Sequence, residues 1–279
     1  MRFHDVAVAI AATAVGLAAT ACAQAVNSNS PSTDAAAGQS VEDGSPRQSV
    51  ATDAPAPLAR ALQLIVFVAP DWTSTTGTLR RFARPDVDTP WRLVESAIPA
   101  VIGRTGLAWA DAALATDMHQ PVKHEGDGKS PAGAFPIDTA FGFAPRSELS
   151  WLRMPYAPLA ASTDCVDDEA SAYYNTVVDR SSVARVDWTS AEHMRQVGQY
   201  RLGLIVGYNA NPPQRGRGSC IFVHIWGGPS STTAGCTALD AGQLEQIMRW
   251  LDAARRPVIV QLPVTEFERL RAAWQLPAL

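Results

Sequence analysis

Short apolar runs, each followed by turn-forming residues, constrain the fold of this 279-residue chain more than any other feature. The clearest run, residues 62–68, is rich in β-branched residues and ends at Ala-Pro, as a buried strand does. Runs of the same kind cover residues 91–94, 100–103, 135–143, 200–208, 219–225 and 258–262. The pattern predicts a mainly β domain, in which residues 200–208 and 219–225 are central strands joined by a loop or wide hairpin.

Two segments carry helix signals instead. Residues 188–197 begin with hydroxyl caps, which predicts a short helix. Asp240 and Gln243 have the spacing of a capping box that opens a helix to about Arg255. Four apolar residues follow at helical spacing and are expected to face the core: Leu244, Ile247, Met248 and Leu251. Helices are therefore expected to be few.

The first 58 residues differ in composition from the rest. Residues 1–23 combine Arg2, an apolar stretch and small residues before a cleavage position after Ala23, which predicts an export signal to the periplasm or cell envelope. The apolar stretch is short for a membrane span of roughly 20 residues, although a retained anchor is the alternative. Cys22 offers a second interpretation, a lipoprotein signal. A lipid on Cys22 is the only membrane attachment that we expect. Residues 24–58 have no aromatic residue and are interpreted as a disordered tether.

Residues 59–279 are expected to form one domain, because no repeat or second linker divides them and β domains reach this length. The whole chain carries a net charge of −4, while residues 1–23 are neutral and residues 24–58 carry −3. About −1 is left for the domain. A near-neutral domain gives no support for nucleic-acid binding, which uses a clustered basic face.

The cysteine count bears on both stability and chemistry. Once Cys22 is cleaved off or lipidated, Cys165, Cys220 and Cys236 remain. An odd number in an oxidising compartment implies a free thiol or an intermolecular bond. If Cys236 is the reactive thiol, Cys165 and Cys220 are left to form a disulfide, which stands as a hypothesis.

His224 and Cys236 carry the candidate chemistry. Alternation along a strand places Cys220, Phe222 and His224 on one face. Cys236 follows a turn of small residues, in which Gly235 permits a tight bend, and the N–H groups of Gly235 and Cys236 are expected to hold a developing oxyanion. A thiol beside an imidazole loses its proton more easily, so the pattern predicts Cys236 as nucleophile and His224 as base of an acyl transfer.

Other interpretations of these residues are weaker. A lone histidine at a strand end is often only a hydrogen-bonded structural residue. Zinc is disfavoured because four residues of strand separate Cys220 from His224 by about 13 Å, too far for ligands of one ion. Papain-like peptidases have their cysteine before the histidine, the reverse of the order here. The Gly-Lys-Ser at 128–130 lacks the earlier glycine of a phosphate loop, and the acidic turn at 164–169 lacks calcium-loop spacing.

Several segments together resemble the catalytic domain of L,D-transpeptidases, the YkuD-like family: residues 123–135, 165–168, 174–175, 218–226 and 232–239. The resemblance covers roughly residues 60–263 and implies an L,D-transpeptidase-type β-sandwich with a few short helices. It implies that Cys236 is the nucleophile, His224 the general base and Gly235 an oxyanion donor, and the Ile225 carbonyl is expected to orient the base. The candidate substrate-binding residues are Lys123, Tyr174, Asn175, Trp226 and Thr233.

The implied reaction uses peptidoglycan stem peptides and no cofactor or metal. A tetrapeptide stem acylates the cysteine with release of D-alanine, and a 3→3 cross-link or transfer to another amine follows. Transfer to water would make an L,D-carboxypeptidase, and loss of activity would leave a wall-binding module of the same fold.

Two positions depart from the family pattern. Ala234 replaces a second histidine, and Ala238 replaces the usual Arg or Asn. The Ala238 position leaves recognition of the substrate carboxylate to a cation elsewhere, for which Lys123, Arg153 and Arg217 are the candidates.

Overall fold

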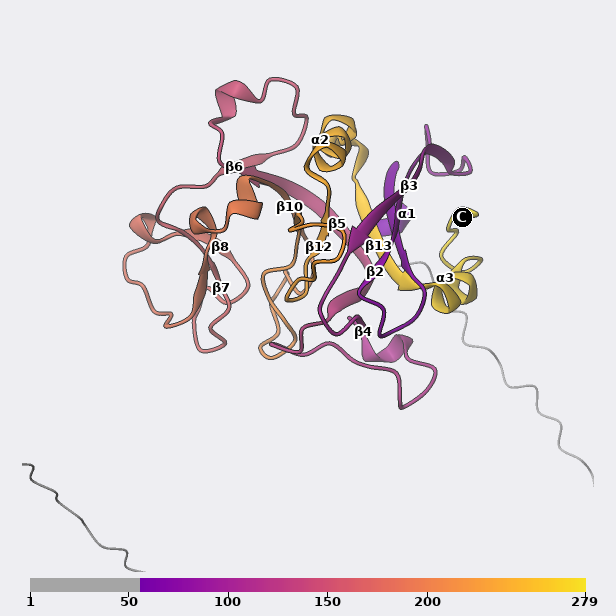
Figure 1. Cartoon of the computed structure of the whole chain (residues 1–279), viewed down its shortest axis with the longest axis horizontal. Coiled ribbons are helices and arrows are strands. Elements are labelled where there is room, and N and C mark those ends of the chain that lie inside the picture. Colours follow the sequence, from indigo (N-terminus) through magenta and orange to yellow (C-terminus); the bar gives the residue numbers. More distant parts are fainter. Residues whose placement is uncertain (1–55) are drawn as a thin grey trace, which may run out of the picture. The chain divides into compact units, whose positions relative to one another are not determined.

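The computed structural model describes residues 56–279, so the predicted export signal, Cys22 and most of the predicted tether lie outside the described residues. This part of the chain is mainly β with a few short helices, as predicted (Figure 1). Its first helix, α1 (Ala56–Ala59), begins inside the segment assigned to the tether, and Leu58 is buried in the core. The folded domain therefore starts slightly before residue 59. Within residues 56–279, no helix combines the length and apolar character needed to span a bilayer.

The strands are β1 (Gln63–Ala69), β2 (Thr76–Ala83), β3 (Arg92–Val101), β4 (Leu107–Trp109), β5 (Ser130–Gly142), β6 (Tyr156–Pro158), β7 (Thr163–Val166), β8 (Val177–Asp179), β9 (Ala191–His193), β10 (Leu202–Val206), β11 (Phe222–Ile225), β12 (Thr237–Leu239) and β13 (Val258–Pro263). The other α-helices are α2 (Ala241–Trp250) and α3 (Val264–Leu270). Short 3₁₀ turns cover Ala112–Leu114, Arg146–Glu148, Arg180–Ser182, Met194–Gln196, Gly198–Arg201 and Ala253–Arg255.

Eight strands form one closed, barrel-like sheet in the order β10-β11-β12-β3-β2-β1-β13-β5, and β5 pairs with β10 to complete the ring. Strand β5 closes the ring by changing partner: its residues 133–136 pair with β13 and its residues 137–142 pair with β10. A β-sandwich would divide these strands between two separate sheets. The domain is therefore not clearly the expected β-sandwich, because β5 hydrogen-bonds to both β13 and β10 and joins all eight strands into one sheet.

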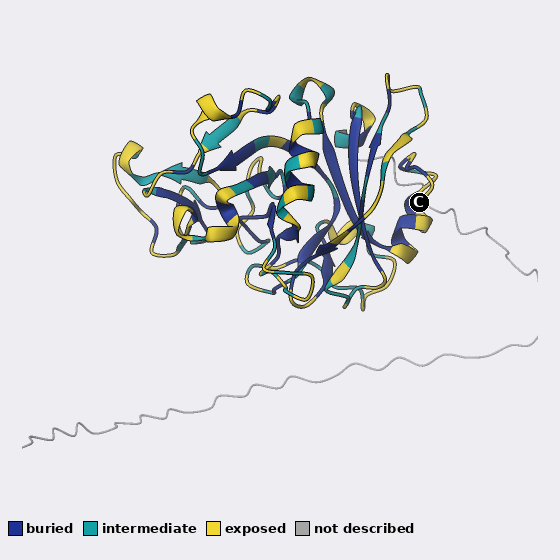
Figure 2. Cartoon of the chain, turned by 45° about the horizontal axis from the view of Figure 1, so that its top comes forward, coloured by how far each residue is buried: buried dark blue, intermediate teal, exposed yellow. Residues whose placement is uncertain are grey.

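The core fills this ring and the space beneath the helices. All seven residues of β1 are buried, so both faces of this strand are covered by other parts of the domain. Buried residues gather on the barrel strands in Figure 2. The apolar stripe predicted for the second helix is confirmed, since Leu244, Ile247, Met248 and Leu251 are all fully buried. Burial of each such side chain stabilises the fold by about 2 kcal/mol.

Helix α2 begins where the sequence predicts. The Asp240 side chain caps it by accepting hydrogen bonds from the N–H groups of Gly242 and Gln243. The reciprocal half of the capping box is not formed, because the buried Gln243 Oε1 has no hydrogen-bond partner within residues 56–279. The helix ends at Trp250, and the 3₁₀ turn Ala253–Arg255 follows instead of further α-helix.

A second, three-stranded sheet lies beside the barrel, in the order β8-β7-β9 (Figure 1). The helix predicted at residues 188–197 is wrong: β9 and the 3₁₀ turn Met194–Gln196 occupy this segment. The Asp168 carboxylate accepts from the N–H and the hydroxyl of Thr189, and β9 pairs with β7. These tertiary contacts outweigh the local helix signal.

A disulfide between Cys165 and Cys220 joins the small sheet to the barrel. Cys220 adopts a left-handed conformation with φ of 55°, and its N–H donates to the Asn175 side chain. This conformation is incompatible with a strand, so β11 begins at Phe222 and not at residue 219 as predicted. The predicted sharing of faces holds nevertheless, since Cys220 and Phe222 pack in one cluster and Ile221 and Val223 in the other.

Candidate active site

Cys236 lies immediately before β12, in the wall of a pocket of about 170 Å³. Its carbonyl oxygen accepts hydrogen bonds from Thr233 Oγ1 at 2.6 Å and from Ser130 Oγ at 3.1 Å. Its Sγ accepts from the N–H of Phe222 at 3.3 Å, and the residue is 5% exposed. Hydrogen bonds to the carbonyl oxygen and to the sulfur of Cys236 thus fix the position of this residue.

The turn before Cys236 is as tight as the small residues suggest. A Cβ on Gly235 would lie 3.0 Å from the Lys129 carbonyl oxygen, so a larger residue would crowd that backbone. The Gly235 N–H donates to Thr233 Oγ1 at 3.1 Å and is therefore already paired. The Cys236 N–H donates to no group within residues 56–279. Of the two expected oxyanion donors, the structure leaves the Cys236 N–H unpaired.

His224 lies on β11, opposite Ala238 of the parallel neighbour β12. Its Nδ1 is 2.8 Å from the Ile225 carbonyl oxygen, the contact expected to orient the ring. If Nδ1 donates in this contact, Nε2 is left as the basic nitrogen. Burial lowers the pKa of His224 because it disfavours the charged imidazolium.

The predicted contact between His224 and Cys236 is not made directly. The register of β11 and β12 pairs His224 with Ala238, two residues beyond Cys236, and no hydrogen bond joins His224 to Cys236 within residues 56–279. The imidazole instead packs edge-on against the ring of Tyr200, with 5.1 Å between ring centroids. Tyr200 therefore contacts the predicted base and belongs to the same packed cluster as Cys236.

Tyr200 makes a hydrogen bond to a carboxylate that the sequence does not reveal. Its hydroxyl donates to Glu192 Oε2 at 2.6 Å, whereas the Cys236 thiol donates to the Cys220 carbonyl oxygen at 3.4 Å. Burial raises the pKa of Tyr200, so this hydroxyl stays protonated at any physiological pH. The register of the small sheet places Glu192 opposite Cys165, so the disulfide helps to hold Glu192 near the pocket.

Five charged side chains line the pocket: Arg104, Lys123, Glu125, Asp167 and Glu192. The buried Oδ1 of Asp167 has no hydrogen-bond partner within residues 56–279. Burial raises the pKa of Glu192, and the negative charges of Asp167 and Glu125 raise it further. The pocket thus holds carboxyl groups in excess over cations and favours a ligand that carries a positive charge or hydrogen-bond donors.

Burial raises the pKa of the Cys236 thiol well above its usual range, and the charge of Glu192 adds to this effect. The Phe222 N–H, the Tyr200 hydroxyl and the Lys123 ammonium act in the opposite direction. With the pKa of His224 lowered, both groups are neutral in the resting site. A resting thiolate–imidazolium pair is therefore disfavoured, and the thiol must lose its proton during the reaction.

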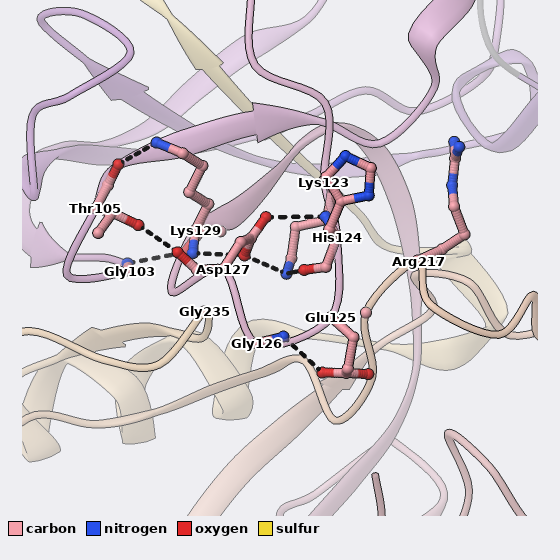
Figure 3. Close-up of polar contacts among 12 residues, drawn as sticks. Gly103, Thr105, Lys123, His124, Glu125, Gly126, Asp127, Lys129, Arg217 and Gly235 are labelled. Atoms are coloured by element: carbon pink, nitrogen blue, oxygen red, sulfur yellow. Dashed lines mark hydrogen bonds and ion pairs between the residues drawn. The ribbon is translucent and has the colours of Figure 1, made fainter. Parts of the chain in front are cut away.

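Lys123 lines the pocket as a candidate substrate-binding residue, but its ammonium group is already paired. The Nζ donates to Asp127 Oδ1 at 2.6 Å and to the His124 carbonyl at 2.7 Å (Figure 3). This residue is 2% exposed, so the pair is buried and holds the loop at 123–129 in place. Two of the three N–H donors of Lys123 are thus committed within this loop.

The other candidate cations are used elsewhere. Arg153 forms an ion pair with Asp252, and Arg217 donates to the Ala110 carbonyl. In Figure 3 the Arg217 side chain points away from the Lys123 ion pair. Arg104, which the sequence did not single out, is the exposed cation at the pocket.

The other four candidate substrate-binding residues make contacts within the protein. The Tyr174 hydroxyl donates to Glu125 Oε2 at 2.6 Å, and the Asn175 amide donates to the carbonyls of residues 208 and 209. Thr233 forms the turn before Cys236, as described above. Trp226 is half-buried and is not among the pocket-lining residues, and its backbone N–H donates to the Leu239 carbonyl. Tyr174 and Asn175 thus shape the loops around the pocket.

A comparison with models of known protein families finds no match for this chain, and a comparison with curated proteins finds none either.

Proposed function

We propose that the domain is a cysteine acyltransferase of the L,D-transpeptidase type that acts on peptidoglycan stem peptides in the cell envelope. The observation that carries the proposal is the thiol of Cys236, which is held in the wall of a charged pocket with its peptide unit fixed by Thr233 and Ser130. The resemblance supplies the fold type, the substrate class and the exported location. The Cys165–Cys220 disulfide supports an oxidising compartment.

In the proposed reaction, Cys236 attacks the carbonyl of the third residue of a tetrapeptide stem. The sulfur forms a bond to this carbon, and the thiol proton passes to a base, for which the resemblance implies His224. The Cys236 N–H, which donates to no group within residues 56–279, is the donor for the tetrahedral oxyanion in this reaction. The proton is then delivered to the leaving amine and D-alanine departs. An amine of a second stem next attacks the thioester carbonyl, an amide bond forms as the C–S bond breaks, and the amine proton returns to the Cys236 thiolate.

The test is incubation of the purified protein with a tetrapeptide muropeptide, followed by mass spectrometry of the products. A dimer that has lost one alanine is expected for the transpeptidase. A tripeptide without dimer would identify an L,D-carboxypeptidase, since water then accepts the acyl group. The Cys236→Ser variant is expected to form neither product, and retained activity in that variant would refute Cys236 as nucleophile.

Ala234 and Ala238 favour a second candidate, a catalytically silent wall-binding module. Both positions lack the polar side chains of the family pattern, and Ala238 is fully buried opposite His224. Intact-mass analysis after exposure to a carbapenem separates the two candidates. An adduct on Cys236 supports the enzyme, whereas binding to purified wall without any adduct would support the silent module.

A further inference from the structure

The terminal carboxylate of a stem peptide needs a cation close to the thiol, and the sequence leaves the identity of this cation open. In a stem that ends in D-alanine, the carboxylate carbon is three bonds from the carbonyl carbon that Cys236 attacks, so the two atoms lie at most about 4 Å apart. A cation that binds this carboxylate must therefore line the same pocket as Cys236. Within residues 56–279, Arg104 and Lys123 line that pocket, whereas Arg153 and Arg217 do not.

Of these two cations, Arg104 is the one with an uncommitted side chain. The Lys123 ammonium is paired with the Asp127 carboxylate and also donates to the His124 carbonyl. The Arg104 guanidinium is exposed and makes no hydrogen bond or ion pair with any of residues 56–279. The five N–H donors of its planar fork match the geometry of a carboxylate.

We propose that Arg104 binds the terminal carboxylate of the stem peptide and so selects stems that end in a free D-amino acid. Arg104 is then a specificity-determining residue of the site. The proposal rests on the proposed function, because it names the group that recognises the leaving residue of the same acyl transfer. It takes the place of the three cations that the sequence offered for this role.

Backbone hydrogen bonds fix the position of Arg104 relative to the nucleophile. The Arg104 N–H donates at 2.9 Å to the carbonyl of Thr233, in the turn before Cys236. Ser130 Oγ accepts from the Gly103 N–H at 3.0 Å and donates to the Cys236 carbonyl at 3.1 Å. A single hydroxyl group thus links the residue before Arg104 to Cys236, and the backbone that carries the guanidinium belongs to the wall of the pocket.

The loop at 123–129 leaves room for the Arg104 side chain at Gly128. The Thr105 N–H donates to the Gly128 carbonyl at 3.1 Å, which holds the loop beside Arg104. A Cβ on Gly128 would lie 2.9 Å from Arg104 Cζ and 3.0 Å from its Nε, so the guanidinium packs against this glycine. Because Gly128 has a φ of 70°, the loop favours glycine at this position and the space stays open.

The distribution of charge around the pocket also favours a carboxylate at Arg104. Two of the lining carboxyl groups come from the small sheet, since Glu192 lies on β9 and Asp167 directly follows β7. Arg104 comes from the barrel, shortly after the end of β3. A ligand carboxylate would meet like charge on the side of the small sheet and opposite charge at Arg104. The leaving residue is therefore bound on the barrel side of the pocket.

The test measures the binding of two synthetic tetrapeptide stems to the full-length Cys236→Ser protein by isothermal titration calorimetry. One stem ends in D-alanine, and the other ends in D-alaninamide, which has nearly the same shape without the charge. The acid is expected to bind at least about tenfold more tightly than the amide, because the amide cannot form a charge-assisted pair with a guanidinium. Adding Arg104→Gln is expected to weaken binding of the acid by a similar factor and to leave binding of the amide within about twofold.

Two further variants complete the comparison. Arg92→Gln removes the same charge from an exposed position at the start of β3, outside the pocket, and is expected to keep the preference for the acid. Arg104→Lys keeps a positive charge without the planar fork and is expected to restore part of the preference. Thermal unfolding of Arg104→Gln should stay close to wild type, because the guanidinium has no partner within residues 56–279.

Equal binding of the acid and the amide by the Cys236→Ser protein overturns the proposal, and so does an absence of binding by either stem. A loss in Arg104→Gln that is the same for both stems, or no loss for the acid, overturns it as well. Failure of the proposed function appears elsewhere, as an absence of D-alanine release by the wild-type protein in the muropeptide assay. The two failures are distinguishable, because binding to the Cys236→Ser protein requires no acyl transfer.

Discussion

Removal of the Cys165–Cys220 disulfide should destabilise the domain by an amount that follows from its position in the chain. The two cysteines are 55 residues apart in sequence, and both are buried. A cross-link that closes a loop of this length lowers the entropy of the unfolded chain, which corresponds to about 4 kcal/mol at 25 °C. We expect the Cys165→Ala/Cys220→Ala variant to lose about this much unfolding free energy, plus a small packing term.

The measurement is urea unfolding followed by tryptophan fluorescence. With a slope of about 2.5 kcal/mol per molar urea, the expected loss lowers the unfolding midpoint by about 1.5 M. Cys236→Ala should be present in every protein compared, since a free thiol could exchange with the disulfide during unfolding. Reduction of the unsubstituted disulfide with dithiothreitol provides the matched control, because both sulfurs then remain in the core.

A loss of less than about 1 kcal/mol in both experiments would refute the reasoning. It would mean that the unfolded chain already keeps residues 165 and 220 close together, so that the covalent bond adds little constraint. A large loss on substitution with little loss on reduction would assign the effect to packing of the sulfurs instead.

Three further predictions follow from the site and its supports. Gly235→Ala should lower the unfolding free energy by about 1–3 kcal/mol and slow the alkylation of Cys236, because the new Cβ meets the Lys129 carbonyl at 3.0 Å, whereas Gly198→Ala, with open space around it, should do neither. Asp240→Ala should lower the unfolding temperature through loss of about 1 kcal/mol of capping of α2, and Asp240→Asn should restore most of it. Folding lowers the pKa of His224 below its ordinary value of 6.5, so at acidic pH the unfolded chain binds a proton at this residue more readily than the folded chain does. Stability should therefore fall as pH decreases from about 6.5, and urea titrations of His224→Gln should show a shallower fall; an unchanged slope would contradict the assigned burial effect.

The parts of the fold that the sequence predicted are those with local or burial-driven signals. Strands β1 and β13 are covered on both faces, so their residues form continuous apolar runs. Helix α2 has its own cap at Asp240 and a regular apolar stripe. Closure of the barrel could not be predicted, because it depends on β5 pairing with both β13 and β10, and nothing local in residues 130–142 marks the change of partner.

The sequence predicted the residues of the His–Cys motif but not the side chains that surround them. His224, Ile225 and Cys236 lie on neighbouring elements as their motif indicates. Glu192 comes from the segment predicted to be a helix, and Tyr200 is the first residue of the strand predicted at residues 200–208; neither prediction relates them to Cys236. Only the pairing of β9 with β7, held by a contact from Asp168 to Thr189, brings Glu192 to the pocket, where the Tyr200 hydroxyl donates to it. A tyrosine directly before a core strand was the one available signal.

Strand β12, which directly follows Cys236, has hydrogen-bonded neighbours on both sides, β11 and β3, whereas Glu192 belongs to a three-residue strand in the small sheet. The two halves of the site therefore open with different free energies. Amide protons of β12 should exchange only when the barrel unfolds, while those of β9 exchange through local opening of the small sheet. Such an opening would move the carboxylate away from the sulfur without disturbing the barrel. Reactivity of the thiol would then respond to temperature and denaturant well before the fold itself does.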